Sequence, residues 1–250
     1  MIDIIYEDNE ILAINKPPGL VVDPADTVKE QTLADILSKE FGIKLPRGGV
    51  VHRLDKDTSG IILVAKTQTA LEDLQNQFKV RKIKKEYLAL VHGKIAEKGK
   101  VEGNIGRNPG NREKFTVLDT GKEAITEYEP INDLTFNALQ LTKIFADFSK
   151  IQMRKLQKQN YGQFTQLYCK PKTGRTHQIR VHLKYINHPI VSDQKYVGRK
   201  MYRLDKRWCP RMFLHAKSIG FYHPRTKVWI NLESELPEDL QGALGNLVYE

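Results

Sequence analysis

The chain is organised around Val51-His52-Arg53-Leu54-Asp55-Lys56-Asp57-Thr58-Ser59-Gly60, which is followed at once by Ile61-Ile62-Leu63-Val64-Ala65-Lys66. A short block of branched aliphatic residues after a turn signal predicts a buried strand. The polar residues before it are therefore expected on a loop that enters this strand. A rigid strand holds such a loop still, which favours reactive side chains there.

The chemistry of this loop is expected in Arg53 and Asp55. They are two residues apart, so in an extended segment they point to the same face. A neighbouring arginine favours the ionised form of a carboxyl group, and an ionised carboxylate can act as a nucleophile or a general base. The alternative is a turn with surface charges. Asp57 fits that alternative, because Asp57-Thr58-Ser59-Gly60 has the chemistry of a turn.

At this point the sequence resembles a known family, the RluA-type pseudouridine synthases. Their catalytic motif has His-Arg-Leu-Asp followed by Thr-Ser-Gly and an aliphatic strand. Further blocks resemble other motifs of the family and occur in the family's order: Lys16–Val22, Lys85–Val91, Thr173–His182, His188–Asp193 and Leu214–Ala216. One such block is weak evidence, but this series covers nearly the whole chain and is specific.

The resemblance implies three catalytic residues, Asp55, Tyr87 and Arg180. Asp55 is expected to be the nucleophile, with attack on the base, attack on the ribose and elimination all left open. Arg180 is expected to keep Asp55 ionised and in place. Tyr87 is expected to stack on the uracil and to help remove a proton; on its spacing alone it would read as an ordinary strand tyrosine.

The resemblance also implies residues that bind the substrate. Arg53 is expected to fill the space left by a flipped uridine, and Ile179 to pack beneath the uracil. Arg107 lies in a glycine-rich segment that resembles a loop with which the family grips RNA, although a mobile loop with solvated charges is the alternative. Arg175 belongs to the third motif and is expected to have a turn or supporting role near the substrate.

Composition sets independent bounds. The 250 residues are 40% hydrophobic, enough for a sizeable core, and we expect a single catalytic domain over residues 1–250 without a separate accessory RNA-binding domain. Cys169 and Cys209 form no Cys-x-x-Cys pair, which argues against a disulfide scaffold and a structural zinc site. No apolar run approaches the roughly 18 residues of a membrane span, and the N-terminus shows no secretion signal. A cytoplasmic location is the default expectation.

The positive charge is concentrated in one region. The net charge is +10, and residues 148–211 alone contain sixteen lysines and arginines but two acids. Most charged runs are solvated surface, but an excess gathered in one region favours a polyanion as partner. A membrane surface would also accept such charge, yet no stretch combines it with a strong apolar helical face. The expected partner is RNA, either ribosomal or transfer RNA.

The expected fold class is α+β, with a mixed, mostly antiparallel sheet and short flanking helices. The resemblance implies the pseudouridine-synthase fold, a bent central sheet with a basic cleft across its middle. Residues 147–160 resemble an insertion, either helical or a long loop. Asp23 stands where family members often have a histidine.

No metal and no cofactor are expected, because isomerisation of uridine to pseudouridine needs none, and a monomer is the default. Two other functions stay open at this point. One is a catalytically silent RNA-binding or RNA-folding protein on the same scaffold. The other is a carboxylate-dependent hydrolase of free nucleosides, which would need a second acid near Asp55; Asp57 is the local candidate.

Overall fold

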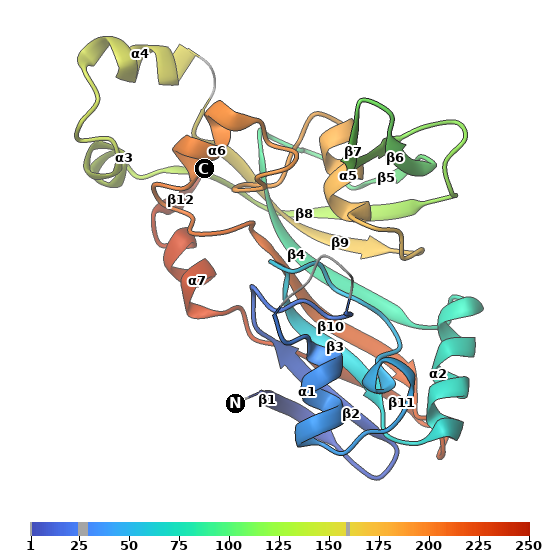
Figure 1. Cartoon of the computed structure of the whole chain (residues 1–250). Coiled ribbons are helices and arrows are strands. Elements are labelled where there is room, and N and C mark those ends of the chain that lie inside the picture. The colour runs from blue at the N-terminus through green and yellow to red at the C-terminus, as the bar shows by residue number, and fades with distance from the viewer. Residues whose placement is uncertain (1, 25–29, 159–160) are drawn as a thin grey trace. The chain divides into compact units, whose positions relative to one another are not determined.

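The computed structural model describes residues 2–24, 30–158 and 161–250, and it divides into two compact units. Unit 1 consists of Met1–Glu86 and His215–Glu235, and unit 2 of Tyr87–Leu214 and Leu236–Glu250. The elements follow the chain in Figure 1 from blue to red. A single catalytic domain over residues 1–250 stays an expectation about function, because two compact units can serve one reaction.

Among its described residues, unit 1 contains a five-stranded arrangement with two helices. Its strands are β1 (Asp3–Glu7), β2 (Ile11–Lys16), β3 (Ser59–Ala65), β10 (Leu214–Tyr222) and β11 (Trp229–Glu233). Neighbours pair in the order β1-β2-β3-β10-β11, and all pairs are antiparallel except the parallel pair β3–β10. The helices are α1 (Leu33–Glu40) and α2 (Gln68–Lys79), and a short 3-10 segment covers Pro46–Gly49.

Local chemistry explains why these elements form. Every residue of β3 is buried, which confirms the strand predicted after the polar loop. Thr32 caps α1 with a capping box, and the Thr67 side chain accepts a hydrogen bond from Ala70 N–H at the start of α2. Gly60 has φ +110°, and a Cβ there would lie 2.3 Å from the Ala216 carbonyl oxygen. The close parallel pairing of β3 with β10 therefore requires glycine at this position.

Unit 2 contains an antiparallel sheet, a separate hairpin and five helices among its described residues. The sheet strands are β4 (Lys84–His92, entering from unit 1), β5 (Gly99–Glu102), β8 (Ile125–Phe136), β9 (Gln163–Pro171) and β12 (Leu247–Tyr249). They pair in the order β4-β9-β8-β12, with β5 also on β8. The hairpin joins β6 (Ile105–Asn108) to β7 (Asn111–Val117). The helices are α3 (Ala138–Ile144), α4 (Lys150–Lys158), α5 (Gln178–Tyr185), α6 (Arg199–Asp205) and α7 (Glu238–Leu244).

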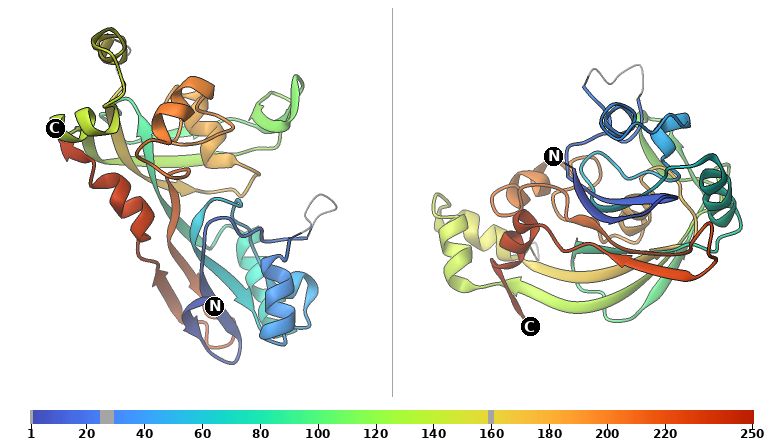
Figure 2. Two further views of the ribbon diagram at one scale, coloured as in Figure 1. Left: turned by 60° about the vertical axis from the view of Figure 1, so that its left-hand side comes forward. Right: turned by 90° about the horizontal axis from the view of Figure 1, so that it is seen from below.

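In the segment expected to be an insertion, residues 147–160, helix α4 covers Lys150–Lys158 and residues 147–149 form a turn and a short connection before it. Helices α3 and α4 lie at the opposite end of unit 2 from α5 and the β6–β7 hairpin (Figure 2). Phe145, between them, is 2% exposed and packs edge-on against Phe136 and Tyr161. The Arg207 guanidinium lies 4.8 Å from the Phe148 ring centre and bonds both carboxylate oxygens of Asp147. The stretch from α3 to α4 is thus anchored by the aromatic packing of Phe145 and by the ion pair of Asp147 with Arg207.

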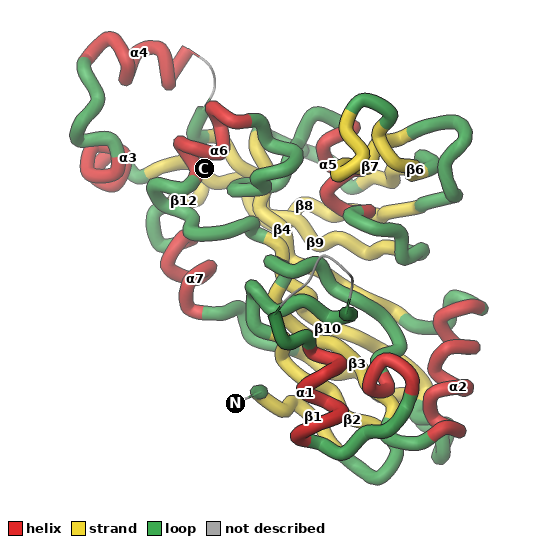
Figure 3. The backbone as a smooth tube through the Cα atoms, viewed as in Figure 1, coloured by secondary structure: helices red, strands yellow, loops and turns green. Residues whose placement is uncertain are grey.

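The observed elements confirm the expected fold class. The strands pair mostly antiparallel, β3–β10 makes the arrangement mixed, and short helices flank the strands in each unit (Figure 3). Among the described residues, no helix is long and apolar enough to cross a membrane.

Candidate active site

The polar loop of unit 1 is fixed to β3 by His52. Its Nε2 accepts a hydrogen bond from Leu63 N–H at 3.0 Å, and its ring centre lies 5.1 Å from that of Phe78. Burial, with the nearby charges of Lys85 and Arg47, lowers the pKa of His52 from 6.5 to about 3. The imidazole is therefore neutral at physiological pH and serves as an acceptor that holds the loop.

Asp55 opens a tight turn on this loop. Thr58 N–H donates to the Asp55 carbonyl oxygen at 3.1 Å, and the Asp55 side chain is half-buried. Asp57, at the turn itself, is exposed, which agrees with the turn role expected for it. Of these two neighbouring acids, Asp55 is the less exposed residue.

A buried lysine ties the N-terminal motif to this turn. Lys16 is fully buried, and its ammonium donates to the carbonyl oxygens of Pro17, Leu20 and Lys56 at 2.7, 3.0 and 3.0 Å. Gly19 N–H donates to the same Lys56 carbonyl at 2.9 Å. Two motifs about forty positions apart in sequence are thus locked together beside Asp55. The sequence offered both motifs but no signal that they touch.

Arg53 extends from the same loop and is loosely held. Its side chain is 58% exposed, and its guanidinium is 3.9 Å from an Asp23 carboxylate oxygen. Asp23 makes its tighter contacts with Arg47, through two hydrogen bonds of 2.7 Å. Asp23, which departs from the family pattern, therefore holds Arg47 tightly and contacts Arg53 only weakly.

Tyr87 and Arg180 belong to unit 2. Tyr87 lies on β4 opposite Cys169 of β9 and is 9% exposed. Arg180 is buried on α5 and donates two hydrogen bonds to the Asp193 carboxylate, at 2.7 and 2.8 Å. Backbone N–H groups of Lys195 and Tyr196 also donate to Asp193. This buried, bidentate pair fixes the guanidinium in one orientation.

Asp193 is a site residue that sequence reasoning missed. It ends the block His188–Asp193, which was quoted as a motif without a role for its carboxylate. The sequence shows an acid within this block but no signal that it pairs with Arg180. The Arg180 guanidinium also lies 5.1 Å from the ring centre of Tyr196.

The other expected residues of unit 2 surround the start of α5 and the hairpin. Ile179 is buried beside Arg180, and the Arg175 side chain donates to the Glu123 carbonyl oxygen at 2.9 Å. Arg107 is exposed on β6, where it donates to the Arg112 carbonyl oxygen at 2.9 Å and lies 5.4 Å from the Phe115 ring centre. Arg175 is thus placed to support a turn, and Arg107 presents its charge on the hairpin.

The structure distributes the expected residues over both units. Arg53 and Asp55 share a loop of unit 1, whereas Tyr87, Arg107, Arg175, Ile179 and Arg180 belong to unit 2. Within the described ranges, no three histidine, cysteine or acidic side chains form a group that could hold a metal ion.

Comparison with known proteins gives a consistent result. A model of the family described as RNA pseudouridylate synthase matches residues 10–185. The uncharacterized RNA pseudouridine synthase YlyB of Bacillus subtilis is 37% identical, over 98% of this chain and 73% of its own length. The ribosomal large subunit pseudouridine synthase D of Pseudomonas aeruginosa is also 37% identical, over 95% of this chain and 69% of its own.

A further sequence relative and a solved structure agree. The synthase D of Xylella fastidiosa is 36% identical, over 96% of this chain and 67% of its own length. The structure of human RNA Pseudouridylate Synthase Domain Containing 1 superposes with a TM-score of 0.73 at 24% identity, covering 100% of this chain and 89% of that one. This structural likeness concerns the fold.

Proposed function

The chain belongs to the RNA pseudouridylate synthase family, and from this premise we propose that its substrate is large-subunit ribosomal RNA. The protein is an isomerase that converts uridine in RNA to pseudouridine. The choice of RNA is carried by one observation, the 36% and 37% identity to two ribosomal large subunit pseudouridine synthases over almost the whole chain.

The reaction is an isomerisation. The bond between uracil N1 and ribose C1′ breaks, the base turns, and a bond forms between C5 and C1′. N1 gains a proton and C5 loses one, so nothing is oxidised or reduced overall. The proposal therefore includes no cofactor.

The catalytic roles are proposals that rest on the family motifs. We propose Asp55 as the nucleophile, Arg180 as the cation that keeps it ionised, and Tyr87 as the ring that stacks on the uracil. The half-buried position of Asp55 and the fixed turn around it support the first role. The bidentate hold of Asp193 on Arg180 supports the second, because a guanidinium in one orientation loses little entropy when it acts.

The target uridine must leave its stack, which costs a few kcal/mol. We propose that Arg53 enters the space it leaves. The weak contact of Arg53 with Asp23 and its exposed side chain support this role, since a loosely held arginine can reorient at small cost. We also propose that Ile179 packs beneath the uracil and that Arg107 and Arg175 assist substrate binding. A monomer in the cytoplasm is the simplest setting for these roles.

Pseudouridine mapping of ribosomal RNA tests the proposal. Cells that lack the protein are complemented with wild type, Asp55→Asn or Asp57→Asn, and RNA from each is mapped. We expect at least one large-subunit uridine to lose its mark and to regain it with wild type and with Asp57→Asn, but not with Asp55→Asn. If the pseudouridine that depends on this protein lies in transfer RNA instead, the choice of ribosomal RNA as substrate is refuted. If Asp55→Asn restores the lost pseudouridine, the assignment of Asp55 as nucleophile is refuted.

A further inference from the structure

A hollow of about 240 Å³ lies in unit 2 between the β6–β7 hairpin, α5 and the segment after Asp193. Three lysines line it, one from each of these elements: Lys114, Lys184 and Lys195. Three aromatic side chains also line it: Phe115, Tyr185 and Tyr196. All of these lining residues belong to unit 2, whereas the Asp55 loop belongs to unit 1.

The lysines bring uncompensated positive charge to the hollow. Within the described part of the chain, neither Lys114 nor Lys184 has a carboxylate at ion-pair distance. The Lys195 ammonium bonds only weakly to the Glu113 carbonyl oxygen, at 3.3 Å, which leaves its charge in place. Three like charges around one small hollow repel each other, and an anion between them relieves this repulsion.

An exposed aromatic ring stands beside these charges. Tyr185 is 60% exposed at the last position of α5. Burying so much aromatic surface is favourable, and a base offers a flat face for it. A free phosphate group would need only the lysines. The lysines together with the exposed Tyr185 ring fit a nucleotide, which has both a phosphate and a base.

The hollow is joined to Arg180 through Tyr196. The Tyr196 ring lies 5.1 Å from the Arg180 guanidinium, and its hydroxyl accepts a hydrogen bond from Phe115 N–H at 3.0 Å. The same hydroxyl is 2.8 Å from His177 Nδ1. A ligand in the hollow therefore contacts the side chain that also packs on Arg180.

We infer that this hollow is a binding site for one nucleotide of the RNA substrate outside the reacting uridine. Its phosphate lies among Lys114, Lys184 and Lys195, and its base stacks on Tyr185. The inference rests on the proposed activity on RNA. It adds a site of recognition that the motif residues do not contain.

Equilibrium binding of a short, fluorescently labelled, single-stranded oligoribonucleotide at several salt concentrations tests the inference. This probe need not contain the target site, so the result does not depend on which RNA is modified. Lys184→Ala should lower the slope of log affinity against log salt by about 0.7, as one phosphate contact is lost. Tyr185→Ala should weaken binding by about 5- to 150-fold with the slope unchanged.

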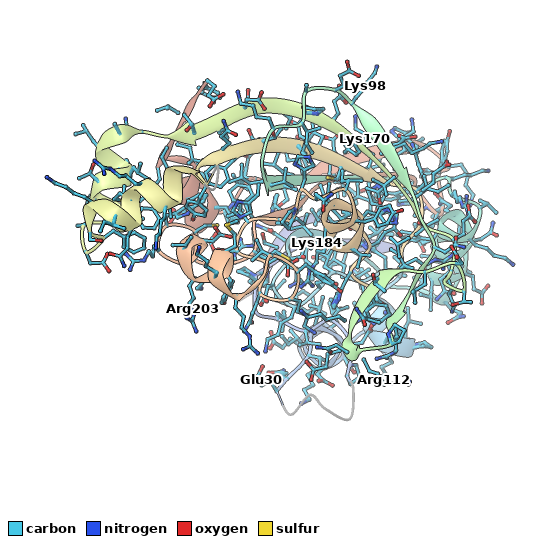
Figure 4. All side chains as sticks on the ribbon, turned by 90° about the horizontal axis from the view of Figure 1, so that it is seen from above. Glu30, Lys98, Arg112, Lys170, Lys184 and Arg203 are labelled. Atoms are coloured by element: carbon cyan, nitrogen blue, oxygen red, sulfur yellow. The ribbon has the colours of Figure 1, made fainter. Side chains whose placement is uncertain are left out.

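Matched exposed residues elsewhere in unit 2 provide the controls. Lys98, on the loop before β5, and Lys184, on α5, are both labelled in Figure 4. Tyr249 on β12 is 74% exposed and matches Tyr185. Lys98→Ala and Tyr249→Ala should bind the probe as wild type does, and thermal melting of every variant should show an intact fold.

Each result decides the inference. If Lys184→Ala and Tyr185→Ala lose no more affinity for the probe than Lys98→Ala and Tyr249→Ala do, the inference is overturned. A loss with Lys184→Ala but none with Tyr185→Ala would show a general anion patch and overturn the nucleotide site. Failure of the proposed function would appear separately, as unchanged pseudouridine marks in ribosomal RNA.

Discussion

At the scale of single residues, His52 makes the stability of the loop depend on pH. Its Nε2 must stay unprotonated to accept the Leu63 N–H bond, and its pKa in the folded protein is lowered from 6.5 to about 3. Between these values the unfolded chain binds a proton that the folded chain does not. Stability is therefore expected to fall as the pH falls from about 6.5 towards 3.

Urea unfolding of wild type and His52→Gln across this range measures the effect. Glutamine keeps an acceptor near the Nε2 position but does not titrate. The free energy of unfolding of the variant should therefore depend less on pH than that of wild type. Equal pH dependence in the two proteins would contradict the assignment of His52 as a neutral, partly buried acceptor.

Asp193 offers a second test on a single residue. Its carboxylate is fully buried against Arg180, so Asp193→Ala leaves a buried charge without its bidentate partner. Removing one member of such a pair costs about 3–5 kcal/mol of unfolding free energy. Asp239→Ala is the control, because Asp239 also holds an arginine with two bonds but is 36% exposed. If urea unfolding shows that Asp193→Ala and Asp239→Ala lose the same free energy of unfolding, the burial of Asp193 does not make its ion pair more important for stability.

At the scale of elements, the sequence predicted best where the signal is local. The buried strand β3 is specified by a few adjacent residues, and it is observed as predicted. The Asp193–Arg180 pair joins two segments across a loop, and no spacing rule encodes such a contact. The roles of Asp55, Tyr87 and Arg180 stay predictions carried by the motifs.

Helices α3 and α4 show the same limit. The sequence of residues 147–160, which contain α4, permits either a helix or a long loop, and α3 precedes this stretch. The exposed Leu139 and Ile151, 81% and 65% accessible, follow no buried stripe. What holds the stretch from α3 to α4 is the burial of Phe145 against aromatic residues distant in the chain, which sequence alone does not reveal.

The anchoring of this segment can be measured. Phe145→Ala should lower the free energy of unfolding by about 3–5 kcal/mol, because a buried aromatic side chain leaves a cavity. Leu139→Ala, in the same segment but exposed, should change it by less than about 0.5 kcal/mol. Urea unfolding compares the two. A small effect of Phe145→Ala would mean that the segment is not packed on the rest of unit 2.

At the scale of the whole molecule, binding and chemistry are expected to separate. A net charge of +10, concentrated in residues 148–211, favours RNA binding through many phosphate contacts. Asp55 is one of thirty acidic residues in the chain, so its loss should barely alter the electrostatic attraction. Asp55→Asn should therefore bind large-subunit ribosomal RNA almost as tightly as wild type and with the same salt dependence, while pseudouridine formation is abolished.

Filter binding from about 50 to 200 mM salt, with pseudouridine formation measured on the same RNA, tests this separation. A protein with 6–10 phosphate contacts loses about 10³- to 10⁵-fold in affinity over that range. The affinities of wild type and Asp55→Asn should decrease along the same line of log affinity against log salt concentration. If Asp55→Asn instead loses affinity and activity in parallel, Asp55 contributes to holding the RNA, and its role as nucleophile must be separated from binding by single-turnover kinetics at saturating protein.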